Sequence, residues 1–111
     1  MKHSDKERIK KIVRYAKELL EYISEQKIDR ERLLKEHPLQ WLVTTPLYNI
    51  GEQAAYIGEE YQKMYSDIPW KRMANLRHRL VHDYDGTNWD IIADIVFDEI
   101  PILLEKLNEV R

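Results

Sequence analysis

The chain contains no cysteine and few of the residues that form tight turns. The absence of cysteine excludes disulfides, thiolate metal sites and cysteine nucleophiles, and it suits a reducing cytoplasm. Three glycines and four prolines are too few for the many hairpins of a β-sandwich, which favours an all-α fold. The longest uncharged run, residues 38–51, is too short to span a bilayer. The basic N-terminus has no apolar run behind it, so we expect neither a signal peptide nor contact with a membrane.

The length of the chain fits one small domain, and its net charge is close to zero. The 111 residues fit a single domain, residues 1–111, and 43% of them are hydrophobic, which is enough for a core. The formal net charge of -2 argues against a protein that coats nucleic acid by bulk charge. The charges are nevertheless unevenly placed, because those of residues 69–82 are all basic and those of residues 83–99 are all acidic. This pattern is compatible with a local anion site.

Hydrophobic periodicity predicts two long helices in the first half of the chain. The first is capped by Ser4 and runs to about Glu25. Asp29 can cap a short turn, and Pro38 can open a second long helix that Pro46 should kink or restart. The apolar face expected for this second helix consists of Leu42, Leu47, Ile50, Ala54, Ile57 and Tyr61.

Two further helices are predicted in the second half. Residues 67–69 form a cap and first turn for a helix that should end near Tyr84. Its apolar stripe consists of Trp70, Met73, Leu76, Leu80 and Val81. Residues 85–86 then form a turn, Asn88 caps the last helix, and Pro101 should bend it. The expected architecture is an up-and-down bundle of four to five helices.

One arginine falls within the apolar stripe of the helix that begins at residue 69. At about 100° per residue, Arg77 lies inside that stripe, and a buried guanidinium needs a carboxylate, hydrogen bonds or an anionic ligand. His78 and His82 lie about 40° apart beside the stripe, and Tyr84 returns close to the arginine. Such a group suits phosphoryl chemistry without a metal, because histidine transfers protons near neutral pH and arginine holds phosphate. An RNA substrate would supply its own nucleophile, the 2′-hydroxyl.

Each of these residues also has a plainer interpretation. Arg77 could form a structural ion pair with Glu52, an acid in an otherwise apolar stretch, and the spacing by itself favours that pairing. His78 and His82 have the spacing of metal pairs, but no third ligand nearby completes a site, so no metal is expected. Tyr84 could be a boundary residue. Three tryptophans are expected to anchor the core rather than to stack on bases: Trp41, Trp70 and Trp89.

Four ordered segments resemble those of a known family. Residues 77–84 match the R-x4-H-x-Y motif of HepT-like proteins, the minimal members of the HEPN (higher eukaryotes and prokaryotes nucleotide-binding) superfamily. Residues 50–54 are similar to the I-G-E-A segment of that family, residues 68–70 to its I-P-W helix start, and residues 100–103 to its final L-P-x-L. The order and spacing of these segments agree over nearly the whole chain.

The resemblance implies an HEPN-like helical fold and the toxin subunit of a toxin–antitoxin pair. The toxin would be a metal-independent ribonuclease without a cofactor, and its antitoxin partner would be a nucleotidyltransferase of the MNT type. Arg77 and His82 would be the catalytic residues, and Tyr84 would be the tyrosine that the partner adenylylates to silence the toxin. Two subunits would place their motifs face to face, which implies a homodimer with a composite cleft.

Three residues around the motif are expected to support it or to bind substrate: His78, Arg79 and Glu52. Two other classes of function remain open. In the first, the protein is a non-catalytic helical module that binds nucleotides or supports a partner nucleotidyltransferase, with Arg77 as an anion anchor. In the second, it is a structural dimerisation domain built on a buried pair of Arg77 and Glu52, and Arg77→Ala should then unfold or dissociate it.

Overall fold

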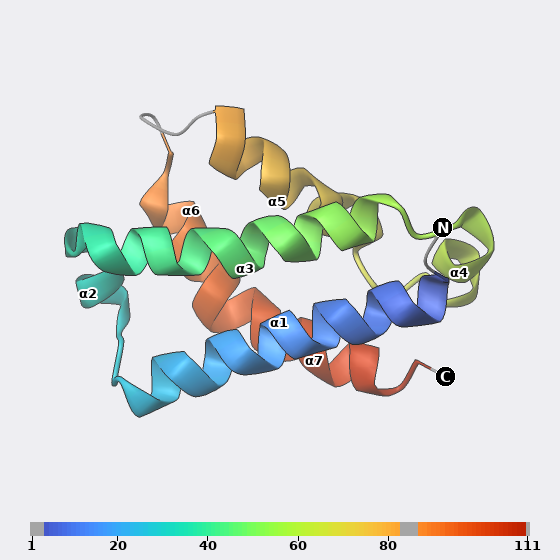
Figure 1. Cartoon of the computed structure of the whole chain (residues 1–111), viewed down its shortest axis with the longest axis horizontal. Coiled ribbons are helices and arrows are strands. Elements are labelled where there is room, and N and C mark those ends of the chain that lie inside the picture. The colour runs from blue at the N-terminus through green and yellow to red at the C-terminus, as the bar shows by residue number, and fades with distance from the viewer. Residues whose placement is uncertain (1–3, 83–86, 111) are drawn as a thin grey trace.

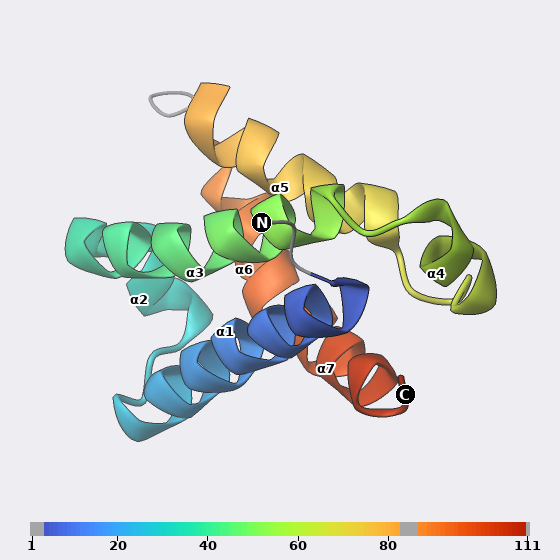
Figure 2. The same ribbon diagram turned by 45° about the vertical axis from the view of Figure 1, so that its right-hand side comes forward.

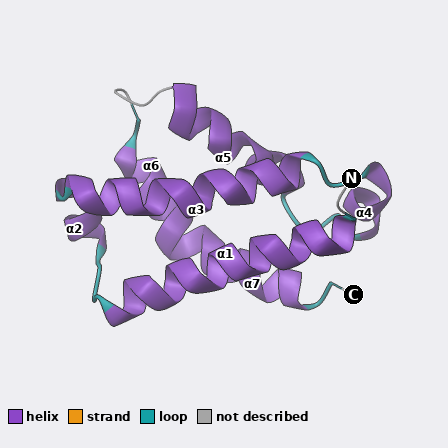
Figure 3. Ribbon diagram, in the orientation of Figure 1, coloured by secondary structure: helices purple, strands orange, loops and turns teal. Residues whose placement is uncertain are grey.

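Helices account for all the regular secondary structure in the part of the chain that the computed structural model describes, residues 4–82 and 87–110 (Figure 3). The elements, in chain order, are α1 (Asp5–Glu25), α2 (Arg30–Lys35), α3 (His37–Ala55), α4 (Glu59–Met64), α5 (Trp70–His82), α6 (Trp89–Asp94), the π-helical segment η1 (Ile95–Glu99) and α7 (Ile100–Asn108). Because α6, η1 and α7 follow one another without a loop, four long helical rods and two short helices make up the fold. The predicted all-α class is confirmed.

Capping residues start the helices where the sequence places them. The Ser4 hydroxyl accepts a hydrogen bond from the backbone N–H of Glu7 at 3.1 Å, and the Asp29 carboxylate accepts one from the N–H of Arg32 at 2.8 Å. The side chain of Asn88 accepts bonds from two backbone N–H groups in the first turn of α6. Each cap satisfies N–H groups that have no partner inside the helix.

The second long helix is shorter than predicted. It runs through Pro46 without interruption and ends at Ala55, so the expected restart at the proline is wrong. Gly58 and a separate short helix, α4, follow, and Tyr61 belongs to α4 rather than to α3. Three residues of the predicted apolar face are buried in α3: Leu47, Ile50 and Ala54. Leu42, by contrast, is exposed.

The predicted bend at Pro101 coincides with a change of helix type. A proline has no N–H to donate to the carbonyl four residues earlier. The chain forms the π-helical turn η1 in the five residues that end just before α7, in which Pro101 occupies the first turn. A single π-helical turn inside an α-helical rod is a recognised cause of a bend in the helix.

The core lies where the four rods meet. Helix α3 packs against both α1 and α5, and α1 also packs against α7 (Figures 1 and 2). The largest fully buried side chains are contributed by α1, α2, α3, α6, η1 and α7: Ile12, Leu33, Val43, Leu47, Ile50, Ile92, Val96, Ile100 and Leu107. No helix in residues 4–82 and 87–110 is both long enough and apolar enough to cross a membrane.

The three tryptophans do not share one role. Trp70 is buried, and its indole N–H donates a hydrogen bond to the carbonyl of Tyr65 at 3.1 Å. Trp89 is partly buried and packs against the core. Trp41 is 59% exposed on the outer side of α3, so the prediction that it anchors the core is wrong. The expectation rested on the aromatic character of Trp41, which does not show whether a residue is buried.

Candidate functional site

An ion pair between α3 and α5 forms the centre of the candidate site. The Arg77 guanidinium donates a hydrogen bond from Nη1 to Oε2 of Glu52 at 3.1 Å. The side chains are 39% and 31% exposed, respectively. The pairing that the isolated acid in α3 suggested therefore exists. The expectation of a buried pair is wrong, because both side chains reach solvent.

A close crossing of the two helices brings these side chains together. A Cβ atom at Gly51 would lie 3.0 Å from the backbone nitrogen of Arg77 and 3.0 Å from the carbonyl oxygen of Met73. Only a residue without a side chain allows this approach without a shift of one helix. The backbone of Arg77 consequently sits against α3, as its place in the apolar stripe predicts. Its long side chain extends past the contact into solvent, as arginine stems commonly do.

Two residues that the sequence analysis did not single out complete the surroundings of Arg77. Tyr56, the residue that caps the C-terminus of α3, lies close enough to the Arg77 side chain to raise the pKa of Arg77. The guanidinium of Arg8 in α1 lies 4.9 Å from the centroid of the Tyr56 ring and donates a hydrogen bond to Oε1 of Gln53 at 3.0 Å. The signal that could have found Tyr56 is its spacing, since it lies four residues after Glu52 and so on the same side of α3.

These contacts keep Arg77 charged and oriented. The hydrogen bond to Glu52 is the main cause that raises the pKa of Arg77, and the contact with Tyr56 raises it further. A guanidinium has five N–H donors in a fixed plane, and a carboxylate on one edge leaves others directed elsewhere. The half-exposed Arg77 can therefore bind an anion such as a phosphate without first being taken out of the core.

The structure describes the other predicted site residues to different extents. His78 is exposed on α5 next to Arg77. Arg79 is exposed too, but it lines a groove between α5 and the α6–α7 rod, on a different side of α5 from Glu52. His82 is the last residue of α5, one turn after His78, and its side chain lies outside the described part of the chain. Tyr84 and the predicted turn at residues 85–86 also lie outside the described residues.

Acidic residues of the second half pair with arginines. Asp94 accepts a hydrogen bond from Arg30 at 2.7 Å, and Glu99 forms an ion pair with Arg72, also at 2.7 Å. Across the residues that the structure describes, no three histidine, aspartate or glutamate side chains come together in a way that could hold a metal ion. The acidic run therefore contributes ion pairs to the surface of the bundle.

Fold and site together define a small all-α protein with an exposed arginine held by a carboxylate between two helices. Residues 6–110 match the family model described as "Ribonuclease HepT-like". The chain belongs to the HepT-like family, as its resemblance to that family indicates.

Curated relatives agree with this assignment. A Thermococcus cleftensis protein named "Probable ribonuclease HepT" is 32% identical over the whole of this chain and 99% of its own length. A Methanocaldococcus jannaschii protein named "Putative RNase MJ0127" is 32% identical over 89% of this chain and 80% of its own length. No solved structure matches the chain significantly.

Proposed function

We propose that this chain is a metal-independent endoribonuclease in which Arg77 and His82 carry the reaction. The observation that carries the proposal is the position of Arg77. Its side chain is 39% exposed and forms an ion pair with Glu52 of α3, and it lies on α5, the helix whose sequence also contains His78 and His82. Membership of the HepT-like family and the ribonuclease names of the relatives support the same substrate class, RNA.

The proposed reaction uses a nucleophile that the substrate brings with it. The 2′-hydroxyl attacks the adjacent phosphorus, and the bond from phosphorus to the 5′-oxygen breaks. One proton leaves the 2′-oxygen and another joins the departing 5′-oxygen, so the products are a 2′,3′-cyclic phosphate and a 5′-hydroxyl. His82 serves as one of the two proton-transfer groups, and Arg77 stabilises the charge that develops on the phosphorane.

Cleavage of RNA in the presence of EDTA tests the proposal. The unmodified protein should cut RNA at an unchanged rate in excess EDTA and should leave 2′,3′-cyclic phosphate ends, because no step needs a metal-bound water. These 3′ ends should resist ligation until the cyclic phosphate is removed enzymatically to leave a 3′-hydroxyl. Loss of activity in EDTA that is restored by added metal would contradict the proposed chemistry.

A homodimer would supply a second copy of the motif, and α3 offers a surface for it. Trp41, Tyr48 and Glu52 lie within roughly 40° of one another around α3. Trp41 and Tyr48 are 59% and 36% exposed, and residues 38–51 carry no charge. Interface cores are enriched in aromatic residues and depleted of charge. This uncharged aromatic surface of α3 ends at Glu52. A second copy that packs on it would therefore lie close to Arg77, as a composite cleft requires.

A charged residue introduced on this aromatic surface of α3 should prevent formation of the homodimer. We expect Trp41→Glu to change the mass measured by light scattering from that of a dimer to that of a monomer, because a carboxylate would have to lose its water on association. Ile102→Glu is the matched control, since Ile102 is similarly exposed on α7. A Trp41→Glu protein that remains a dimer would place the interface elsewhere.

We further propose that the chain is the toxin of a cytoplasmic toxin–antitoxin pair and that an MNT-type nucleotidyltransferase silences it by adenylylating Tyr84. The R-x4-H-x-Y spacing supports this, because a nucleotide on Tyr84 would place phosphate charge and a bulky base near the motif. Tyr84→Phe has no hydroxyl to accept the nucleotide, so this variant should keep cutting RNA after incubation with the transferase and ATP. Normal silencing of Tyr84→Phe would disprove the mechanism.

A further inference from the structure

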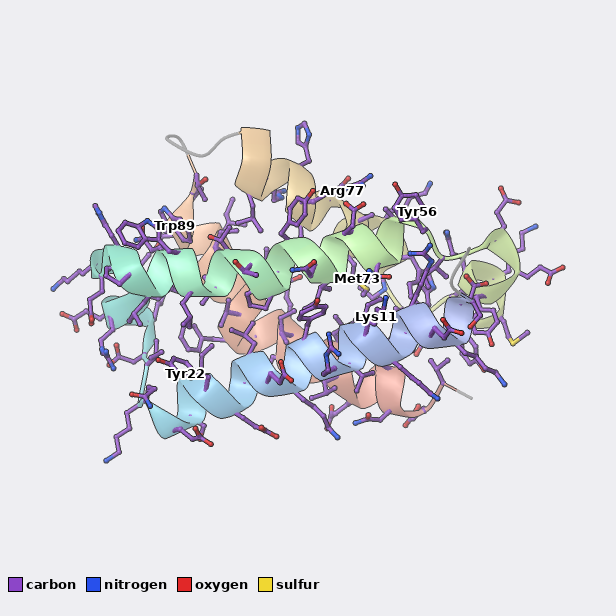
Figure 4. The ribbon with its side chains drawn as sticks, viewed as in Figure 1. Lys11, Tyr22, Tyr56, Met73, Arg77 and Trp89 are labelled. Carbon is purple, nitrogen blue, oxygen red and sulfur yellow. The ribbon has the colours of Figure 1, made fainter. Side chains whose placement is uncertain are left out.

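We propose that Arg8 and Tyr56 form a subsite that holds the nucleotide next to the scissile phosphate of a single-stranded RNA. This inference rests on the proposed ribonuclease function and extends it to substrate binding. Arg77 and Tyr56 lie along the same edge of α3 (Figure 4). Tyr56 in turn lies beneath the guanidinium of Arg8, at 4.9 Å from the ring centroid.

The exposure of Tyr56 shows that its ring is available to a ligand. The residue is 57% exposed although the Arg8 guanidinium lies over its ring, so much of the ring faces solvent. An exposed aromatic ring with a cation on one face can stack on a base with the other face, and stacking of this kind does not depend on base identity. Tyrosine is also a stiff side chain, so it loses little conformational freedom when a base covers it.

The contacts of Arg8 hold a positive charge in place without cancelling it. One N–H donates to the amide oxygen of Gln53 at 3.0 Å, and the guanidinium plane lies over an uncharged ring. Both partners are neutral. Arg8 therefore retains a charge that can pair with a backbone phosphate, and its orientation is fixed by two contacts from α3.

The order of the three side chains corresponds to the order of groups in RNA. Arg77, Tyr56 and Arg8 present a cation, a ring and a cation, and linked nucleotides present a phosphate, a base and a phosphate. A strand whose reacting phosphate lies at Arg77 would thus stack one base on Tyr56 and place the next phosphate at Arg8. A duplex has its bases stacked on one another, so this arrangement selects unpaired RNA.

Binding of an uncleavable RNA separates this subsite from catalysis. The probe is a short single-stranded RNA with a 2′-O-methyl group on every nucleotide, which lacks the attacking hydroxyl. We expect Tyr56→Leu to weaken its binding, measured by fluorescence anisotropy, by about tenfold or more, and Tyr56→Phe to leave it nearly unchanged. Arg8→Met should weaken binding and reduce the slope of log K against log salt by about 0.7, the value for one phosphate contact with a single strand.

Two control variants test whether the loss of RNA binding is specific to Tyr56 and Arg8. Tyr22→Leu removes another exposed tyrosine and Arg72→Met another exposed arginine, and neither should alter binding. If Tyr56→Leu and Tyr56→Phe both lower kcat and leave the Kd of the probe unchanged, Tyr56 only positions Arg77 and the subsite is disproved. A change of mass in solution for Tyr56→Leu would overturn it in favour of a subunit contact. Probe binding that depends on both residues in a protein that cuts no RNA would support the subsite and reject the nuclease.

Discussion

Replacement of Arg77 by alanine should lower the rate constant for RNA cleavage by about 10²–10³-fold, the usual effect of removing one group that stabilises transition-state charge. The protein should stay folded. The side chain is 39% exposed and its pair with Glu52 reaches solvent, so its removal leaves no buried charge without a partner. Single-turnover cleavage measures the first expectation, and thermal unfolding followed by circular dichroism measures the second.

Arg72→Ala provides a control on the same helix. Arg72 also pairs with a glutamate, at 2.7 Å, but that residue is Glu99 on the far side of α5. This variant should cut RNA at the wild-type rate. Equal losses in the two variants would indicate a general effect of positive charge on α5. Unfolding or dissociation caused by Arg77→Ala alone would restore the interpretation of the Arg77–Glu52 pair as structural.

Sequence periodicity predicted the helices well where local signals and burial agree. The caps at Ser4, Asp29 and Asn88 and the apolar stripes of α1 and α5 are local features, and the structure confirms them for the residues it describes. The end of α3 was not predicted. The apolar residues at 57 and 61 continue the helical spacing, and periodicity alone does not reveal that Gly58 starts a new, short helix.

The solvent exposure of side chains was the property that the sequence predicted least well. Trp41 and Leu42 belong to an uncharged segment, and hydropathy cannot show that both residues are exposed to solvent. For Arg77, the angle around the helix correctly placed the backbone against α3. An angle does not give depth, however, and the length of the arginine side chain carries its charge to the surface.

The candidate site was partly accessible to sequence reasoning. Glu52 stood out because it is an acid in an apolar stretch, and the structure pairs it with Arg77. Arg8 could not be found in this way, since it reaches Gln53 from 45 residues away in the sequence. Such a contact depends on how α1 packs across α3. Tyr56 combines both cases, because its helical spacing from Glu52 is local and its contact with Arg8 is tertiary.

Replacement of His82 by alanine should have the largest effect on cleavage, a loss of about 10²–10⁴-fold in rate, the range for a proton-transfer group. His82 is five residues after Arg77 on α5, which places it about 140° further around the helix. Positions 140° apart lie on largely different sides of one helix, so a facing second copy would help to bring an arginine and a histidine to the same phosphate. Uncleavable RNA should bind to His82→Ala as tightly as to the wild type, because Arg77 remains.

His37→Ala is the control for this substitution, since His37 is exposed at the start of α3 and remote in sequence from the motif. The wild type and the control should show rates that change with pH across the range in which histidine titrates, and His82→Ala should lose one limb of that profile. Cleavage that survives His82→Ala with the same profile would assign proton transfer to His78 or another group. If no preparation cuts RNA while the uncleavable probe still binds in a manner that requires Arg77, the protein is a nucleotide-binding module and Arg77 is its anion anchor.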